Sequence, residues 1–280
     1  MSPPGRRRAA APGGKAPLPL LVDAGNTRLK GCLLSGTRLH DVRAQHWARG
    51  GERRAADALL RAMRRAAGRR TVARLLACSV AGTTLERALR AAARDAGLPA
   101  PQFIRSARRG GGVRNGYAEA WRLGADRFIA LVGARAQHPG RALLLVDAGT
   151  ALTIDLVDAG GRHRGGLLVP GPELMVAALL GQTAGIRRRA GRLDVLASAG
   201  KSAAPFGRST RAGLASGALL ACASLVERAA REARATLGAA PLLLLSGGAA
   251  AAIAPRLRLR ARLEDRLVFA GLALLAREAL

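Results

Sequence analysis

The four residues Val-Asp-Ala-Gly occur twice in this chain of 280 residues, at positions 22–25 and again at positions 146–149. The first copy reads Leu20-Leu-Val-Asp-Ala-Gly-Asn-Thr-Arg-Leu-Lys30, and the second reads Leu143-Leu-Leu-Val-Asp-Ala-Gly-Thr-Ala-Leu-Thr-Ile-Asp155. Each apolar run predicts a buried strand that ends in a carboxylate, followed by a glycine turn and a Thr-containing hairpin. Such a hairpin can hold phosphate and a metal ion. Asp-Ala-Gly could also be a plain turn, but two matched copies so far apart favour a duplicated domain.

Strands and helices alternate along the rest of the chain, which predicts an α/β fold. The first half should contain a strand, turn and strand over residues 18–35, helices at 57–68 and 83–96, strands at 71–80 and 103–105, a glycine-rich loop at 110–112, and helices at 117–121 and 125–135. The second half should contain strands over 141–157 and 242–245, a turn at 246–248, and helices at 173–180, 209–237 and 269–280. We expect a disordered Arg/Ala/Pro tail at residues 1–17 and two domains, residues 18–140 and 141–280.

The formal net charge of +28 invites a nucleic-acid interpretation. The 46 basic residues are nearly all Arg, however, and they are spread through every predicted helix beside abundant Ala and Gly. No basic stretch is interleaved with aromatic residues, so we expect no nucleic-acid partner. We also expect no membrane span, because no apolar run reaches about 20 residues. The best candidate, residues 213–226, is interrupted by Ser and Gly and predicts a buried helix.

The cysteines and histidines predict no metal site. The three cysteines are too few and too scattered for a disulfide framework, so we expect a reducing cytoplasm. The histidines lack metal-binding spacing, and we expect surface or loop positions with no catalytic role. The cysteines are Cys32, Cys78 and Cys222, and the histidines are His40, His46, His138 and His163.

Two glycine-containing segments could contact a nucleotide. Gly200-Lys201-Ser202 matches the end of a Walker A loop, but that loop needs a Gly where Val195 stands, so we expect only a flexible loop. The turn Ser246-Gly247-Gly248 could let a nucleotide approach its backbone or could be a plain strand-to-helix connection. The sequence leaves both options open.

Five patterns follow one another along the chain. D-x-G-N-T-x-x-K is met by Asp23, Gly25, Asn26, Thr27 and Lys30. N-x-Y followed by L-G-x-D-R is met by Asn115, Tyr117, Leu123, Gly124, Asp126 and Arg127, and D-x-G-T-A-x-T-x-D by Asp147, Gly149, Thr150, Ala151, Thr153 and Asp155. The later G-G and P-G are met by Gly165, Gly166, Pro170 and Gly171, and a Pro-Phe-Gly-Arg-Ser-Thr stretch ends at Thr210. In this order the patterns resemble the type III pantothenate kinases of the acetate-and-sugar-kinase, heat-shock-70 and actin superfamily.

The resemblance implies two duplicated actin-like, or ribonuclease H-like, domains with a cleft between them. It also implies transfer of the ATP γ-phosphoryl group to pantothenate, the first step of coenzyme A biosynthesis, with Mg²⁺ and a monovalent cation, K⁺ or NH₄⁺. Two positions depart from the family pattern: Ala120 stands where Pro is frequent, and Ala249 where Asp is usual.

The resemblance also implies roles for individual residues. Asp23 would hold Mg²⁺, directly or through water, and Asp147 the monovalent cation. Asp126 would be the catalytic base, and Arg127 would keep it ionised and bind the transferred phosphate or the substrate. The phosphates would be cradled by Gly25, Asn26, Thr27 and Lys30, with Thr150 and Thr153 in support. Pantothenate would meet Tyr117, Gly124, Ala125, Asp126 and Arg127, with Thr210 reaching in from the other half of a homodimer.

Other interpretations remain open from the sequence. Asp126 and Arg127 could form a structural salt bridge at a helix start, and Tyr117 could be a half-buried anchor bonded to backbone. The chain could be another small-molecule kinase of the same fold, a gene-regulatory accessory factor, or a catalytically silent scaffold. Residues 209–237 are rich in Ala, Gly and Leu on more than one face, which favours a homodimer.

Overall fold

The structure of the protein is a computed structural model that describes residues 17–191, 193–198 and 206–278. The predicted tail, apart from Pro17, lies outside the described residues, and so does the loop at 199–202. Two five-stranded sheets with the same strand order form the framework. The first has the order β3-β2-β1-β4-β5, with β1 Leu18–Ala24, β2 Arg28–Ser35, β3 Arg38–His46, β4 Val72–Ser79 and β5 Pro101–Ile104. The second has the order β10-β9-β8-β11-β12, with β8 Leu143–Ala148, β9 Ala151–Val157, β10 His163–Pro170, β11 Leu242–Ser246 and β12 Arg262–Leu263.

The two sheets also match in strand direction. In each, the first strand pairs antiparallel with the next strand of the chain and parallel with the strand on its other side. The two Val-Asp-Ala-Gly copies therefore occupy equivalent places, at the ends of β1 and β8. This repetition confirms the predicted α/β fold with a duplicated, actin-like architecture.

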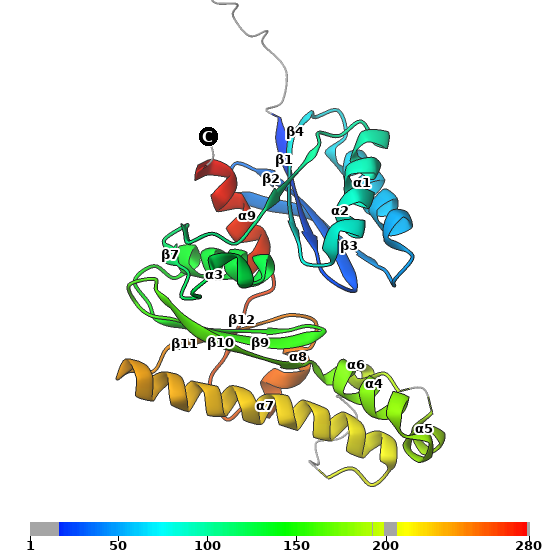
Figure 1. Ribbon diagram of the computed structural model, residues 1–280, viewed down its shortest axis with the longest axis vertical. Helices are drawn as coiled ribbons and strands as arrows, with labels where there is room; N and C mark the ends of the chain where they lie inside the picture. The colour runs from blue at the N-terminus through cyan, green and yellow to red at the C-terminus, as the bar shows by residue number, and fades with distance from the viewer. Residues whose placement is uncertain (1–16, 192, 199–205, 279–280) are drawn as a thin grey trace, which may run out of the picture.

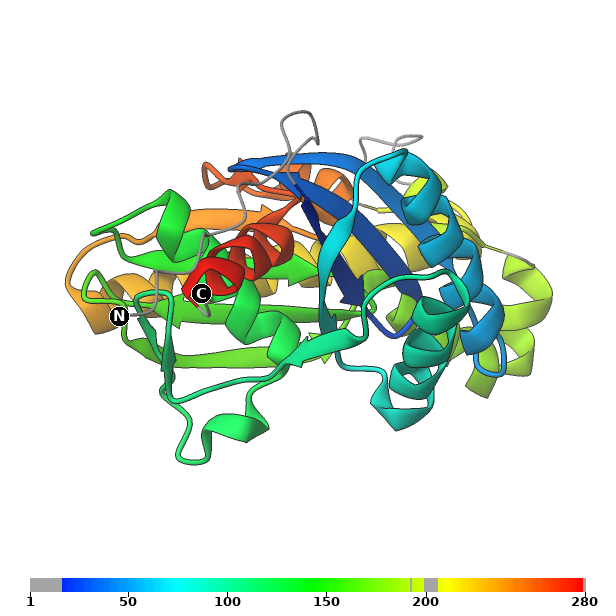
Figure 2. The same cartoon turned by 90° about the horizontal axis from the view of Figure 1, so that it is seen from above.

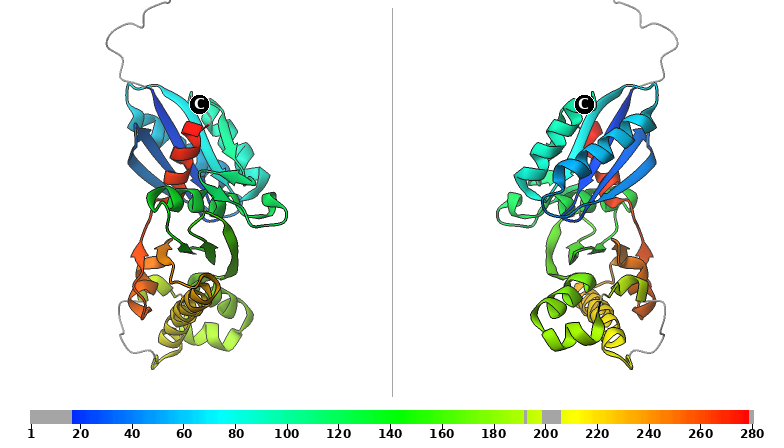
Figure 3. Two further views of the ribbon diagram at one scale, coloured as in Figure 1. Left: turned by 90° about the vertical axis from the view of Figure 1, so that its left-hand side faces the viewer. Right: turned by 90° about the vertical axis from the view of Figure 1, so that its right-hand side faces the viewer.

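Helices separate and cover the two sheets in alternating layers (Figures 1 and 3). Helices α1 Glu52–Ala67 and α2 Gly82–Asp95 pack on the outer face of the first sheet. Between the sheets lie α3 Ala125–Gln137 and α9 Leu267–Glu278. The outer face of the second sheet is covered mainly by α7 Thr210–Leu237. The shorter elements are β6 Arg109–Gly110, β7 Val113–Arg114, α4 Pro172–Gln182, α5 Ala184–Ala190, α6 Val195–Ser198, α8 Ala250–Ile253, and the 3₁₀ turns Ala120–Arg122 and Ala254–Arg256.

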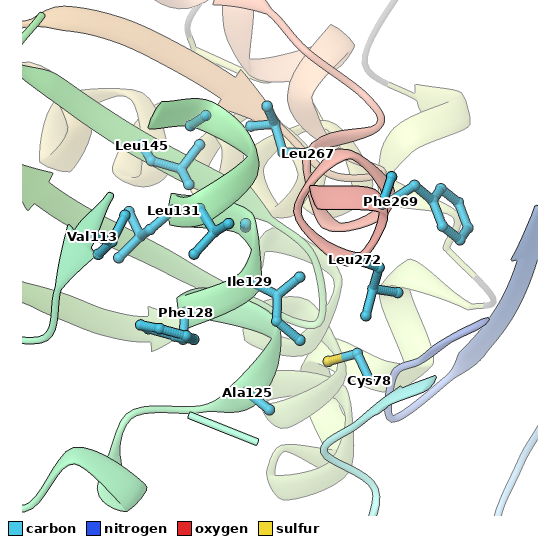
Figure 4. Close-up of a cluster of buried hydrophobic side chains, with 14 of the residues drawn as sticks. Cys78, Val113, Ala125, Phe128, Ile129, Leu131, Leu145, Leu267, Phe269 and Leu272 are labelled. Atoms are coloured by element: carbon cyan, nitrogen blue, oxygen red, sulfur yellow. The ribbon is translucent and has the colours of Figure 1, made fainter. Parts of the chain in front are cut away.

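Side-chain alternation along β1 explains this layering. Successive side chains of a strand point to opposite faces. Leu20 and Val22 therefore join α1 and α2 in the outer core, whereas Leu21 joins the central core with α3 and α9. Figure 4 shows that central core, where Phe128 of α3 and Leu272 of α9 lie between the sheets.

The crossing of α3 and α9 depends on two glycines. A Cβ atom on Gly133 would lie 2.0 Å from the carbonyl oxygen of Leu267, and one on Gly271 would lie 2.0 Å from the carbonyl oxygen of Ile129. The helix backbones touch here. Helix α9 comes from the second half of the sequence but packs beside the first sheet (Figure 2). Near its end, Arg277 Nη2 donates a hydrogen bond of 2.8 Å to the Gly36 carbonyl of the β2–β3 turn.

The prediction of a helix at 117–121 is wrong. Only Ala120–Arg122 forms a 3₁₀ turn. The Asn115 side chain accepts a hydrogen bond from the Tyr117 amide at 3.0 Å and donates to the carbonyls of Ala107 and Ala120, so it replaces the helical hydrogen bonds of this segment. The predicted glycine loop at 110–112 connects the short hairpin β6–β7, and α1 begins at Glu52 rather than at 57.

Helix α7 contains the segment that the sequence offered as the best candidate for a membrane span. It is the one helix in the described part of the chain that is long and apolar enough, by composition alone, to cross a membrane. Its side chains Leu219, Cys222 and Val226 are fully buried against the second sheet, as the sequence predicted for a buried helix at residues 213–226. The three cysteines of the chain are all free, and all three are buried.

Candidate active site

The β1–β2 and β8–β9 turns face each other between the two halves of the molecule. Thr27 of the first turn and Thr150 of the second are exposed, and their hydroxyl oxygens lie 3.2 Å apart. Backbone hydrogen bonds of 3.0 Å close both turns, from Gly25 N to Arg28 O and from Gly149 N to Ala151 O. The duplicated hairpins thus bring two hydroxyl groups to one point.

Asp23 lies at the end of β1 behind this point. Burial raises its pKa to about 6, because the charged form loses hydration. Lys30, whose Nζ lies 3.7 Å from the carboxylate, offsets part of this effect, while the charges of Asp126 and Asp147 add to it. Three carboxylates therefore create a negative potential that attracts a cation.

Asp147 occupies the equivalent place at the end of β8. The Ser246 hydroxyl donates a hydrogen bond of 3.1 Å to its carboxylate, and burial raises the pKa of Asp147 above its ordinary value. The adjacent Gly247 has φ +93°, and a Cβ atom there would lie 2.6 Å from Asp147 Oδ1. The turn at 246–248 therefore wraps closely around Asp147. Ala249, where the family pattern has Asp, is buried in the core between α7 and the second sheet.

Asp126 stands in the first turn of α3. Its Oδ1 accepts a hydrogen bond of 2.8 Å from the backbone amide of Arg127, and a Cβ atom on Gly124 would lie 2.6 Å from the same oxygen. Burial raises the pKa of Asp126, and the nearby charge of Asp147 raises it further. A carboxylate whose pKa is shifted toward neutrality is suited to accept a proton.

Burial raises the pKa of Asp126 and outweighs the backbone amide and the charge of Arg127, which lower it, and the two side chains form no salt bridge in the described structure. The guanidinium lies instead on Asp155 of β9, with Nε at 2.9 Å from Oδ2 and Nη2 at 2.6 Å from Oδ1. Its third nitrogen, Nη1, donates to the Tyr117 hydroxyl at 3.1 Å. Tyr117 is half-buried, and its hydroxyl meets a side chain rather than backbone.

The expectation that His163 is a surface residue is wrong. Its side chain is fully buried, and Nε2 lies 2.8 Å from Asp155 Oδ1. Burial by itself would raise the pKa of Asp155, but hydrogen bonds from His163 and Arg127 hold that pKa below its ordinary value. The sequence indicates no individual role for Asp155, although it stands two residues after Thr153 in β9 and therefore points to the same face. No pattern in the sequence pointed to a role for His163.

Thr210 is not brought to these residues within one chain. It begins α7, which covers the outer face of the second sheet, whereas Tyr117 and α3 lie on the inner face. Thr153 pairs with Asp147 in the β8–β9 register and is half-buried.

The isolated carboxylates of this site suit a hard cation that takes most of its ligands from water and from the substrate. Among the described residues, no group of three His, Cys, Asp or Glu side chains is arranged to hold a metal ion. Mg²⁺ in kinases typically uses one or two carboxylates and completes its octahedron with water and substrate phosphates. The single carboxylate of Asp23 fits that requirement.

Comparison with known proteins gives a consistent result. The profile of the family described as Type III pantothenate kinase matches residues 19–232. Type III pantothenate kinases of Herminiimonas arsenicoxydans and Aromatoleum aromaticum are 38% and 39% identical, over 90% and 92% of this chain and 95% and 98% of theirs. A ROK family glucokinase from Streptomyces griseus, solved with glucose and AMPPNP, shares the fold at 13% identity with a TM-score of 0.54, over 93% of this chain and 99% of that one.

The duplicated fold with its opposed hairpins is that of the acetate-and-sugar-kinase, heat-shock-70 and actin superfamily, and the family match places the chain among the kinases of that superfamily, which use ATP and a divalent metal. Within that class, the chain belongs to the type III pantothenate kinase family.

Proposed function

We propose that the protein transfers the γ-phosphoryl group of ATP to the primary hydroxyl of pantothenate, the first step of coenzyme A biosynthesis. The contact between Thr27 and Thr150 carries this proposal, because it joins two carboxylate-bearing hairpins at one point. Family membership supplies the acceptor. Phosphoryl transfer needs charge neutralisation, alignment and a proton acceptor, and the site offers groups for each.

The first hairpin forms the ATP side of the site. Asp23 holds Mg²⁺, directly or through water, and the bound ion would neutralise charge on the transferred phosphoryl group. Lys30 adds a fixed positive charge 3.7 Å from Asp23. The turn residues Gly25, Asn26, Thr27 and Thr150 offer backbone amides, a side-chain amide and hydroxyls to the phosphate oxygens.

The start of α3 forms the acceptor side. Asp126 accepts the proton of the pantothenate hydroxyl as that oxygen attacks phosphorus. The raised pKa of Asp126 supports this role, since a base works best when its pKa approaches the working pH. Gly124, Ala125, Arg127 and Tyr117 line the pantothenate pocket, with Arg127 and Tyr117 already joined by a hydrogen bond.

Asp147 binds a monovalent cation, potassium or ammonium. Its buried carboxylate lacks a direct basic partner among the described residues and is held by the Ser246 hydroxyl. A monovalent cation there would offset the combined charge of the carboxylates and the phosphates.

The active form is a cytoplasmic homodimer, with no nucleic-acid partner. Gly213, Gly217 and Leu220 form an exposed strip of small and apolar side chains on α7, and nothing lies within 4 Å of a Cβ atom built on either glycine. A second copy packed on this strip would bring Thr210 toward the partner's pantothenate site.

An acceptor panel tests the proposed function. ADP release is measured with pantothenate, glucose or acetate as the only acceptor, in the presence of ATP, Mg²⁺ and potassium. We expect turnover with pantothenate alone. Turnover with glucose or acetate instead would support another kinase of the superfamily, and nucleotide binding without turnover would support a regulatory or scaffold role.

A further inference from the structure

The buried cluster of Arg127, Asp155, His163 and Tyr117 joins the two halves of the molecule beside the proposed acceptor site. We propose that His163 is a positioning residue for phosphoryl transfer, because it fixes the Arg127 guanidinium and the Tyr117 ring that bind pantothenate. This inference rests on the proposed function, which places Arg127 and Tyr117 on the pantothenate side.

The first step is the hydrogen bonding of Asp155. Its Oδ1 accepts from Arg127 Nη2 at 2.6 Å and lies 2.8 Å from His163 Nε2, while its Oδ2 accepts from Arg127 Nε at 2.9 Å. The three side chains are 8%, 2% and 0% exposed for Arg127, Asp155 and His163. In such a dry environment the charged hydrogen bonds are strong and directional, so His163 and Arg127 share one fixed carboxylate.

The second step is the fixing of Tyr117. Its ring stacks on the His163 imidazole with centroids 5.7 Å apart and an interplanar angle of 20°. The Arg127 guanidinium carbon lies 5.7 Å from the same ring, and its Nη1 donates to the hydroxyl. His163 therefore contacts Tyr117 directly and orients Arg127 through Asp155.

The two ring nitrogens of His163 have different surroundings. Nδ1 is buried and has no hydrogen-bond partner within the described residues. Nε2 lies 2.8 Å from Asp155 Oδ1, and because an ionised carboxylate only accepts hydrogen bonds, Nε2 is the donor. His163 therefore acts on the cluster through Nε2 and the face of its ring.

The backbone lies very close to the side chains of this cluster. A Cβ atom on Gly116 would lie 2.0 Å from the His163 carbonyl oxygen, and one on Gly166 would lie 2.5 Å from both Arg127 Nη2 and Asp155 Oδ1. Two glycines thus let the segment before Tyr117 and the strand after His163 close around the ion pair. A buried ion pair is seldom retained for stability alone, since apolar replacements are often as stable.

Two substitutions separate the two contacts of His163. His163→Phe keeps an aromatic ring for Tyr117 but removes the donor to Asp155, and His163→Gln keeps a donor but removes the ring. Steady-state kinetics with varied pantothenate and varied ATP, together with thermal unfolding, are measured for both. His138→Gln is the matched control, because His138 is also largely buried but pairs with Glu264, away from this cluster.

We expect His163→Phe to raise the KM for pantothenate about tenfold to a hundredfold, the effect of losing one hydrogen bond to a charged group. The KM for ATP and kcat should change by less than about threefold, because only acceptor binding is loosened. His163→Gln should fall between the Phe variant and the wild type, and His138→Gln should match the wild type.

An unchanged pantothenate KM in folded His163→Phe would overturn the proposal, as would an equal rise in the KM for both substrates. If the Phe variant does not fold, the Gln variant decides the question: a raised pantothenate KM supports the proposal and a wild-type value overturns it. A wild-type enzyme that does not phosphorylate pantothenate would contradict the proposed function itself, and this inference with it.

Discussion

Replacement of Asp23 by Asn should make the ligand-free protein more stable while it removes activity. The pKa of Asp23 is raised from 3.8 to about 6, which corresponds to roughly 3 kcal/mol of disfavoured ionisation. That value already includes the attraction of half-exposed Lys30, whose Nζ lies 3.7 Å from the carboxylate. At pH 8 without nucleotide or Mg²⁺, we therefore expect a gain of about 3 kcal/mol in the free energy of unfolding.

The pH dependence gives this prediction a second readout. Because the folded-state pKa lies above the unfolded value, the folded protein binds the extra proton between about pH 4 and pH 6, and wild-type stability falls as the pH rises through that window. The advantage of Asp23→Asn should accordingly be small near pH 4 and reach its full size above pH 7. Denaturant unfolding at both pH values measures it.

Asp158→Asn is a control of opposite sign. Burial by itself would raise the pKa of Asp158, but hydrogen bonds from the Arg162 amide at 2.9 Å and from Arg164 Nε at 2.8 Å together hold that pKa below its ordinary value. Loss of Asp158 should not stabilise the protein at pH 8. An Asp23→Asn variant less stable than the wild type at pH 8 would refute the argument that buried charge dominates at Asp23.

Four further predictions follow from the site and the core. Asp126→Asn should lower kcat by about 10²–10⁴-fold in the coupled assay while the fold stays intact, whereas wild-type turnover would remove its role as base. Asp147→Ala should abolish activity in potassium, and equal wild-type rates with a large organic cation in place of potassium would argue against a cation site there. Gly217→Glu should give an inactive monomer by light scattering, and a fully active monomeric wild type would contradict the dimer. Gly133→Ala should cost about 1–3 kcal/mol in unfolding free energy, because the new Cβ meets the Leu267 backbone, and an unchanged unfolding midpoint would contradict that close contact.

Much of the framework was predictable from the sequence because its signals are local. The repeated run before Asp23 and Asp147 carries its own periodicity and turn residues, so both hairpins could be located and matched. Helices with a regular apolar face were found for the same reason. Strand β3 was missed because its side chains are mostly exposed and polar, as at Arg38 and Arg43, and because its pairing with β2 is visible only in the sheet.

The parts that could not be predicted depend on partners far away in the chain. Arg127 stands next to Asp126, yet its guanidinium pairs with Asp155, 28 positions later. His163 is buried because the β9–β10 hairpin packs against the segment around Gly116, which no local pattern encodes. At Tyr117 the predicted helix failed for a local reason: the Asn115 side chain takes up the backbone hydrogen bonds.

The central claim is tested most directly by mass-spectrometric detection of the product. Purified wild type and Asp126→Asn are incubated with pantothenate, ATP, Mg²⁺ and potassium, and 4′-phosphopantothenate is quantified over time. The account predicts ATP-dependent product in the wild type and at least about a hundredfold slower formation in the variant. Absence of product from folded wild-type protein, or equal rates in the two proteins, would contradict it.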